Sequence, residues 1–250
     1  MEERKRTALI TGASQGLGAC VAARLAKLGF RVIVNYASST ARAERVAAGI
    51  RETGGDAVPF RCDVSQEKAV EAMFAELEEQ FGGVDVLVNN ARVDPLSRRP
   101  EESDGDWWDR VMAVGLKGAY LCCREFLRYA DGHRNGRIVN LSSSRACRPN
   151  ELEMIAYATS KLGMHSLTRS YAAACAPFGI TVNTLAPGMI ATENMLKRIG
   201  PDGYAAECAT IALRRAGSCD EIADGVVWAV ENGFMTGETI NINGGQAYAP

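Results

Sequence analysis

Hydrophobic and polar positions along this chain switch repeatedly between the period of a strand and that of a helix. Short apolar runs rich in β-branched residues, such as "RVIVNY", predict buried strands, whereas apolar residues every three or four positions predict helices. We expect about seven strands, at residues 7–11, 31–36, 57–64, 84–90, 137–143, 180–187 and 238–244. We expect helices at 15–29, 40–53, 66–81, 103–130, 153–176 and 218–231, and an irregular or helical segment over 189–215.

This alternation predicts the fold class. Strands that are apolar throughout are typical of a parallel sheet with helices on both faces. No linker or low-complexity segment interrupts the pattern, so we expect a single-domain doubly wound α/β (Rossmann) fold over residues 1–250. Such sheets bind ligands outside the carboxyl ends of their strands.

Composition narrows the function classes. The 250 residues are 47% hydrophobic and 23% charged, the balance of a globular protein. A net charge of -2 offers no general attraction to nucleic acid or to an anionic membrane, so neither is an expected partner. The start, "MEERKR", has no apolar signal-peptide core, and no stretch approaches the ~20 apolar residues of a spanning helix. We therefore expect a cytoplasmic location.

The eight cysteines and two histidines lack the spacing of metal ligands, so no metal site is expected. Most of the cysteines lie in apolar surroundings and are interpreted as small buried hydrophobic residues.

A glycine-rich turn, "TGASQGLG" (11–18), follows the first strand and opens the first helix. Glycine lets the backbone turn tightly and approach a pyrophosphate, and a helix N-terminus presents free N–H groups to it. In a first strand–helix–strand unit this predicts a dinucleotide site. Its residues are Gly12, Ser14, Gln15, Gly16, Leu17 and Gly18.

The end of the second strand bears on which dinucleotide binds. An acid there would bind the 2′-hydroxyl of NAD and repel a 2′-phosphate. The residues are instead Asn35, Tyr36, Ala37, Ser38 and Ser39. Asn and Ser can donate to a phosphate and Arg42 could reach it, although no arginine lies directly at the strand end and Gln15 is neutral. NADP(H) is therefore favoured over NAD(H); the alternative is that these polar residues only begin a loop.

The chain resembles the short-chain dehydrogenases/reductases, especially their 3-oxoacyl-carrier-protein reductase and glucose dehydrogenase branch. The motifs that carry the resemblance are "TGASQGLG", "CDV" (62–64), "NNA" (89–91), "IVNLSS" (138–143), "YATSK" (157–161) and "NTLAPGMIAT" (183–192). The resemblance implies hydride transfer between a nicotinamide cofactor and a ketone or secondary alcohol. It also implies cofactor contacts from Asp63, Val64, Asn89, Asn90, Ala91, Tyr157, Lys161, Pro187, Gly188, Ile190 and Thr192.

The same resemblance implies that Tyr157 is the acid/base, Lys161 its partner, and a serine the holder of the substrate oxygen. The residues themselves support the pair, because positions four apart share one face of a helix. A nearby ammonium favours phenolate and lowers the pKa of a phenol, which is otherwise about 10.

The serine is ambiguous. Counting from "RIVNLSS" selects Ser143, whereas counting back thirteen from Tyr157, a common spacing in the family, selects Ser144. We choose Ser143 and expect Ser142 to point away or to end the strand.

Two positions depart from the family pattern. Arg92 follows "NNA" where the family usually has glycine, and Gly115 replaces the asparagine of the long helix that helps to hold a relay water. Arg92 either favours an anionic substrate or points to solvent. Gly115 leaves two alternatives: the relay works through its backbone carbonyl, or the chain is a catalytically impaired nucleotide-binding sensor or assembly protein.

Substrate and assembly are less constrained. Residues 189–217 mix apolar and charged side chains around Gly200 and Gly203, which predicts a mobile substrate lid. The substrate class stays open between a 3-oxoacyl thioester and another small carbonyl. The family resemblance implies a homotetramer, with a homodimer as the alternative, paired through helices 103–130 and 153–176.

Overall fold

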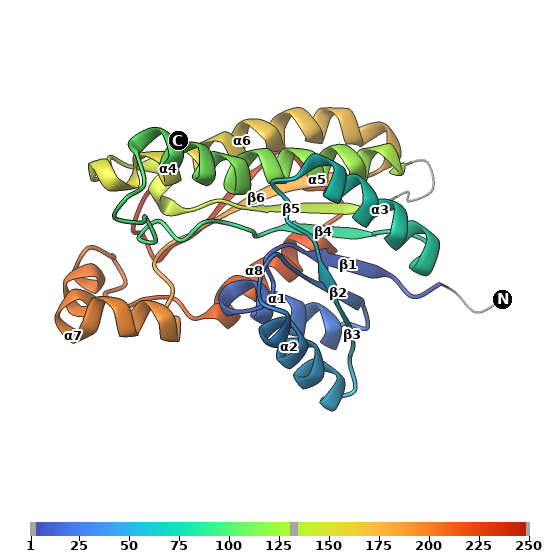
Figure 1. Cartoon of the computed structure of the whole chain (residues 1–250), viewed down its shortest axis with the longest axis horizontal. Coiled ribbons are helices and arrows are strands. Elements are labelled where there is room, and N and C mark those ends of the chain that lie inside the picture. The colour runs from blue at the N-terminus through green and yellow to red at the C-terminus, as the bar shows by residue number, and fades with distance from the viewer. Residues whose placement is uncertain (1–3, 131–134, 249–250) are drawn as a thin grey trace.

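The predicted strands form one parallel seven-stranded sheet in the order β3-β2-β1-β4-β5-β6-β7 (Figure 1). The computed structural model describes residues 4–130 and 135–248. The strands are β1 Thr7–Ile10, β2 Arg31–Tyr36, β3 Asp56–Arg61, β4 Val86–Asn89, β5 Arg137–Leu141, β6 Thr181–Pro187 and β7 Thr239–Ile242. The doubly wound (Rossmann) fold is thereby confirmed.

Helices cover both faces of this sheet. They are α1 Gly16–Lys27, α2 Thr40–Glu52, α3 Glu67–Phe81, α4 Asp104–Met112, α5 Gly118–Arg128, α6 Ile155–Cys175, α7 Glu193–Ala209 and α8 Cys219–Glu231. In Figure 1, α1, α2 and α8 lie below the sheet, α3, α5 and α6 lie above it, and α7 projects beyond it. Each face therefore has its own hydrophobic core.

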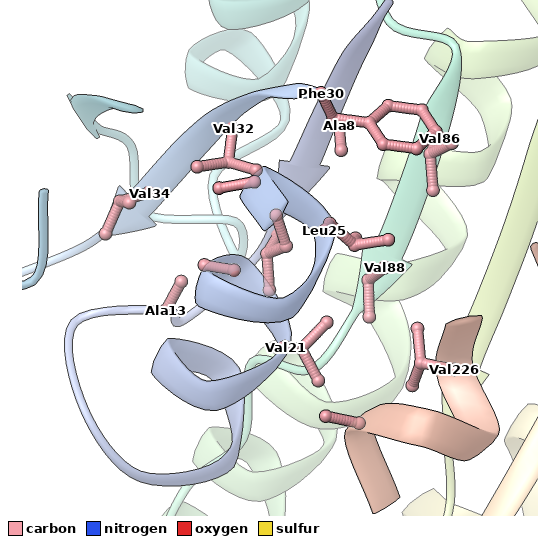
Figure 2. Close-up of a cluster of buried hydrophobic side chains, with 14 of the residues drawn as sticks. Ala8, Ala13, Val21, Leu25, Phe30, Val32, Val34, Val86, Val88 and Val226 are labelled. Carbon is pink, nitrogen blue, oxygen red and sulfur yellow. The ribbon is translucent and has the colours of Figure 1, made fainter. Parts of the chain in front are cut away.

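Strand alternation divides the apolar side chains between the two cores. Ala8 and Ile10 of β1 join Val21 and Leu25 of α1 on the lower face (Figure 2). Leu9, between them, belongs to the upper core with residues of α3 and α5. All three β1 side chains are fully buried, because both faces of a parallel sheet are covered.

The expected single helix over 103–130 is interrupted. A π-helical turn, Ala113–Lys117, joins α4 to α5, and Gly115 lies in its middle. A π turn inserts an extra residue into the helix, and such turns occur frequently at functional sites. The expected irregular or helical segment over 189–215 contains α7, which is broken at Gly200 (φ 65°, ψ 179°) before Pro201.

Five of the eight cysteines are buried, as expected for most of them, and Cys20, Cys147 and Cys219 are partly exposed. Across residues 4–130 and 135–248, no helix is both long and apolar enough to cross a bilayer. The same residues contain no group of three or more His, Cys, Asp or Glu side chains that can hold a metal ion.

Candidate active site

The strand order reverses between β1 and β4, and the glycine turn lies at this switch point. The side chain of Asn90, just after β4, donates hydrogen bonds to the carbonyl oxygens of Thr11 (2.8 Å) and Gly12 (3.0 Å). Thr11 Oγ1 accepts in return from the backbone N–H groups of Asn90 and Ala91, both at 3.0 Å. Asn90 and Ala91 thus fix the turn.

Two glycines of the turn cannot be replaced without a clash. Gly12 has φ 63°, and a Cβ there would lie 2.9 Å from the Cα of Ala91. A Cβ at Gly18 would lie 2.5 Å from Asn90 Nδ2. Gln15, the N-cap of α1, makes no side-chain capping bond, and the first turn holds no acid. The closely packed turn and this helix N-terminus fit a pyrophosphate.

Asn35, expected to read the adenosine ribose, lies beneath the turn instead. Its Oδ1 accepts from the backbone N–H of Gly12 (3.1 Å), and its Nδ2 donates to the carbonyl of Cys62 (3.0 Å). The residue is 1% exposed, and its neighbour Tyr36 is also buried. The Asn35 side chain therefore supports the turn rather than projecting from the end of β2.

Two other polar residues lie just after the end of β2. Ser38 is exposed, and the guanidinium of Arg42 donates a 2.8 Å hydrogen bond to Gln15 Oε1. Arg42 belongs to the first turn of α2, whereas Gln15 belongs to the glycine turn. This bond brings a cation over the edge of the candidate dinucleotide site.

The expected adenine contacts lie after β3. Asp63 is exposed, and its Oδ1 accepts from the backbone N–H (3.0 Å) and the hydroxyl (2.8 Å) of Ser65. Val64 is buried against Gly118 of α5, where a Cβ would lie 2.8 Å from Val64 Cγ2.

Tyr157 and Lys161 lie together on α6, as the sequence predicts. The Lys161 side chain is buried, its ammonium donates a 2.7 Å hydrogen bond to the Leu141 carbonyl, and its nitrogen lies 5.9 Å from the centre of the Tyr157 ring. Burial and, to a smaller extent, the positive charge of Arg92 lower the pKa of Lys161 to about 7. The site thus holds the Tyr157 phenol beside an amine, that of Lys161, whose charge can change near neutral pH.

The three consecutive serines after β5 make different contacts. Ser142 Oγ donates to the carbonyl of Lys161 (2.8 Å) and lies 2.8 Å from Nε2 of buried His165, so it is directed into α6. Ser143 Oγ accepts from the backbone N–H of Arg145 (3.2 Å). Ser144 Oγ donates to Gln246 Oε1 (3.2 Å).

A buried polar chain crosses the sheet below these serines. Asn89 Nδ2 donates to Asn140 Oδ1, Asn140 Nδ2 donates to Thr168 Oγ1, both at 2.8 Å, and Thr168 Oγ1 lies 2.6 Å from Thr184 Oγ1. The chain ties β4, β5 and β6 to α6 and so positions the helix that carries Tyr157. Sequence reasoning missed Asn140 and Thr168, although a polar residue inside the apolar strand "RIVNL" is a usable signal.

The expected nicotinamide contacts lie at the carboxyl end of β6. A Cβ at Gly188 would lie 2.9 Å from the Cα of Asn243, so this glycine permits close approach to the end of β7. Ile190 forms an isolated bridge with Gly217, and Thr192 caps α7 by accepting from the backbone N–H of Met195 (3.3 Å). Pro187 to Thr192 thus lead from the sheet into α7.

Gly115 faces α6, the helix that carries Tyr157. A Cβ there would lie 3.1 Å from Ser160 Oγ, which itself donates a 2.7 Å hydrogen bond to the carbonyl of Tyr157. The π turn is present with glycine at this position, and Ser160 lies where a side chain at position 115 would begin.

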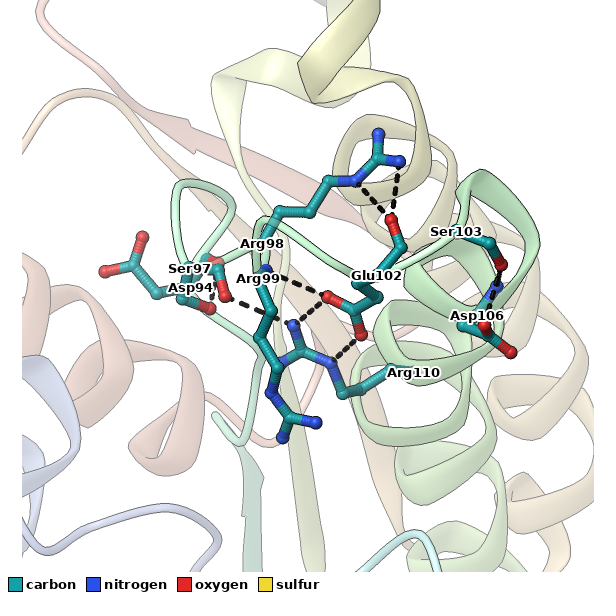
Figure 3. A network of polar contacts seen from close by, with 8 residues as sticks. All are labelled: Asp94, Ser97, Arg98, Arg99, Glu102, Ser103, Asp106 and Arg110. Carbon is teal, nitrogen blue, oxygen red and sulfur yellow. Dashed lines mark hydrogen bonds and ion pairs between the residues drawn. The ribbon is translucent and has the colours of Figure 1, made fainter.

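Polar contacts tie the loop between β4 and α4 to α4 itself. Glu102 accepts two hydrogen bonds from Arg110, at 2.6 and 2.7 Å, and Arg98 donates to the Glu102 carbonyl (Figure 3). These bonds from Arg110 lower the pKa of Glu102 to about 2. Trp107, buried beside Arg110, belongs to a small apolar cluster that includes Tyr157.

Arg145 connects the loop after β5 to α7. One end of its guanidinium pairs with Glu151, and its Nη2 lies 3.7 Å from Glu207 Oε1 near the end of α7. The Arg145 side chain is only 18% exposed, so its guanidinium is largely shielded from water in the pair with Glu207.

Comparisons with known proteins identify relatives of this chain in sequence and in structure. A sequence model of the family described as short chain dehydrogenase matches residues 6–202. The chain is 37% identical over 244 residues to the 3-oxoacyl-[acyl-carrier-protein] reductase FabG of Staphylococcus aureus, covering 96% of this chain and 97% of that protein. It is 32% identical over 248 residues to glucose 1-dehydrogenase 2 of Bacillus subtilis, covering 98% and 96%. A solved short-chain dehydrogenase/reductase from Serratia marcescens superposes with a TM-score of 0.87 at 32% identity, covering 97% and 98%.

Proposed function

Because this chain belongs to the short-chain dehydrogenase family of oxidoreductases, we propose that it interconverts a ketone and a secondary alcohol, with Tyr157 as acid/base. The observation that carries the proposal is the placement of the Lys161 ammonium beside the Tyr157 ring on one face of α6. The nicotinamide cofactor, when bound, supplies or accepts the hydride.

The residues of the chain supply the proton chemistry. During reduction the Tyr157 phenol gives its proton to the oxygen on which negative charge develops. Positive charge on Lys161 favours the phenolate that remains, since an opposite charge nearby stabilises the ionised form. Tyr157 packs against a small apolar cluster that contains Trp107, which leaves it partly buried.

Ser143 is the serine that we assign to the substrate oxygen. Its oxygen accepts from a backbone N–H, which leaves its own hydroxyl proton available for donation. Ser144 already gives its proton to Gln246, and Ser142 gives its proton to the carbonyl of Lys161. Donation from Ser143 to a developing oxyanion would stabilise the transition state.

We assign NADP(H) as the favoured cofactor on the charge around the end of β2. Exposed Ser38 and the guanidinium of Arg42 can bind a 2′-phosphate, and Gln15 holds Arg42 in place. The residues from Asn35 to Ser39 include no acid that would repel that phosphate.

For the substrate, the proposal is a 3-oxoacyl thioester or another small carbonyl compound. The names of the two relatives, a 3-oxoacyl reductase and a glucose dehydrogenase, support this range. The segment 189–217, with its break at Gly200, would act as the lid.

Assembly into a homotetramer is part of the same proposal. Large apolar side chains on the outer surface of α4, α5 and α6 support it: Trp108, Tyr120, Ile155 and Leu162 are each at least 38% exposed.

The test is oxidation of NADPH and NADH by the purified protein against a panel of ketones, β-keto thioesters and quinones. Tyr157→Phe should lose activity by about 10²–10⁴-fold while its affinity for NADPH, measured by calorimetry, stays within about twofold. Tyr171→Phe, on the same helix but hydrogen-bonded to the Tyr120 carbonyl, is the matched control and should keep activity.

Two results would count against the proposal. Retained activity in Tyr157→Phe would remove Tyr157 from the acid/base role. Cofactor binding without turnover by the parent on any substrate would favour the impaired sensor or assembly protein, and Gly115→Asn would then be the variant to examine.

A further inference from the structure

The packed interface between α1 and α8 brings two cysteines together. Cys20 lies in the second turn of α1, and Cys219 is the first residue of α8. Each thiol changes the pKa of the other, because Cys219 lowers the pKa of Cys20 and Cys20 raises that of Cys219, and both residues are partly exposed. They are 199 positions apart in the chain, so only the fold places them side by side.

Charged neighbours hold the two helices in register at this point. Arg24, one turn after Cys20, lies 2.7 Å from Asp224 and 3.9 Å from Asp220 of α8. A capping box between Ser218 and Glu221 fixes the start of α8. The two thiols are therefore held at a defined position of a rigid helix pair rather than on mobile loops.

We propose that Cys20 and Cys219 form an oxidation-sensitive thiol pair, which hydroperoxides convert into a disulfide that joins α1 to α8. This inference rests on the α1–α8 interface and is independent of the proposed function. No step of the proposed reaction uses either cysteine.

The surroundings favour the thiolate of Cys20, whereas they raise the pKa of the Cys219 thiol, which stays protonated. The hydrogen bond from Cys219 lowers the pKa of Cys20 to about 7, so a large fraction is thiolate at neutral pH. Burial raises the pKa of Cys62 and Cys175 to about 11. Cys147, which is also partly exposed, has its pKa raised by burial and has no thiol partner in its surroundings as described.

The chemistry balances with hydrogen peroxide as the oxidant. The Cys20 thiolate attacks one peroxide oxygen, an S–O bond forms as the O–O bond breaks, and hydroxide leaves. The Cys219 sulfur then attacks the sulfenic sulfur, the S–S bond forms, and the oxygen leaves as hydroxide while the thiol proton goes to water. Two thiols and one peroxide thus give one disulfide and two water molecules.

A disulfide at this point would join two parts of the candidate site. Cys20 follows the glycine turn by two residues, after Gly18. Cys219 follows Gly217, which pairs with the segment after β6 through its backbone N–H to the Met189 carbonyl (2.9 Å). The closed loop would contain about 200 residues, and loop closure of that size stabilises the fold against unfolding.

The test is peroxide treatment of the native full-length chain, followed by alkylation, denaturation and tryptic mass spectrometry. Trypsin releases Cys20 in peptide 7–24 and Cys219 in peptide 216–250, each with a single cysteine. We expect a linked peptide lighter by two hydrogens than the sum of the two. The free thiol of Cys20 should disappear at least about ten times faster than that of Cys147, because a larger fraction of Cys20 is thiolate.

Variants make the test decisive. Cys20→Ser and Cys219→Ser should each abolish the linked peptide, whereas Cys147→Ser should leave it unchanged. The oxidised parent should also melt at a higher temperature than the reduced parent, and dithiothreitol should reverse this. The proposal is overturned if Cys147 reacts as fast as Cys20, or if Cys20 is oxidised to sulfinic acid with no link to Cys219.

Discussion

The ammonium nitrogen of Lys161 lies 5.9 Å from the centre of the Tyr157 ring, and its hydrogen bond is to the Leu141 carbonyl. Lys161 is only 1% exposed, so its charge is held in an apolar setting. The structure thus places an amine with a pKa of about 7 next to the candidate acid/base.

Burial of this amine predicts a stability that rises with pH. The folded pKa of Lys161 is lowered to about 7, whereas an unfolded lysine has a pKa of about 10.4. Between these values the unfolded chain binds a proton that the folded chain does not, so the contribution of Lys161 to unfolding free energy increases by up to about 1.4 kcal/mol per pH unit. Denaturant unfolding of the parent and of Lys161→Met, over this pH window without cofactor, measures the difference.

The parent should gain stability relative to Lys161→Met as the pH rises through this window. Exposed Lys117→Met is the control and should follow the parent. If the unfolding free energies of the parent and of Lys161→Met change in parallel with pH, Lys161 keeps an ordinary pKa.

The contact between Gly115 and Ser160 predicts coupled substitutions. A Cβ at Gly115 would lie 3.1 Å from Ser160 Oγ, so Gly115→Ala alone should gain little or lose stability. In a Ser160→Ala background the same change should stabilise by about 0.5–1 kcal/mol, the usual helical gain of alanine over glycine. A double-mutant cycle by urea unfolding measures the coupling.

Gly49 in α2 provides the control for that cycle, because its Cβ position has no neighbour within 4 Å. Gly49→Ala should raise the free energy of unfolding by the same amount in the parent and in the Ser160→Ala variant. If Gly115→Ala changes the free energy of unfolding equally in the two backgrounds, Ser160 does not oppose a side chain at position 115.

The position of Arg42 predicts that its removal will weaken the use of NADPH more than that of NADH. Loss of a charge-assisted hydrogen bond to phosphate costs about 1.5–3 kcal/mol, so Arg42→Ala should raise the KM for NADPH by about tenfold or more. The KM for NADH should change by less than about twofold, since NADH has no 2′-phosphate. Steady-state kinetics with both cofactors is the measurement, and exposed Arg45→Ala on the same helix is the control. An equal loss with both cofactors would assign Arg42 to the glycine turn rather than to the phosphate.

The link from Arg145 to Glu207 predicts a role for α7 in substrate binding. A partly exposed ion pair contributes up to about 1 kcal/mol, so Glu207→Gln should raise the substrate KM by up to about fivefold with little change in kcat. Glu151→Gln removes the other partner of Arg145, which lies outside α7, and should change KM less. If the two variants raise KM equally, the effect belongs to the orientation of Arg145 and not to the lid.

The sequence predicts the sheet and the placement of Tyr157 beside Lys161 because the signals for both are local. A strand such as "RVIVNY" and the spacing of Tyr157 and Lys161 depend on a few neighbouring residues. Helix ends differ by only a few residues from the prediction, as for α6, expected over 153–176 and found at Ile155–Cys175.

Other features depend on contacts that the local pattern does not contain. Asn35 was expected to face the cofactor, but the pleat of β2 turns its side chain toward Gly12. The approach of Gly115 to Ser160, 45 positions later, and the Cys20–Cys219 pair both depend on helix packing. Tertiary contacts of this kind decide side-chain direction, which periodicity alone leaves open.

The position of β1 inside the sheet has a consequence for biosynthesis. β1 pairs with β2 on one side and with β4 on the other, and β4 begins only at Val86. A nascent chain that has emerged as far as β3 therefore exposes one edge of β1 with unpaired backbone groups. That edge is only four residues long, which gives other nascent chains a short template for intermolecular pairing while β4 is still being made.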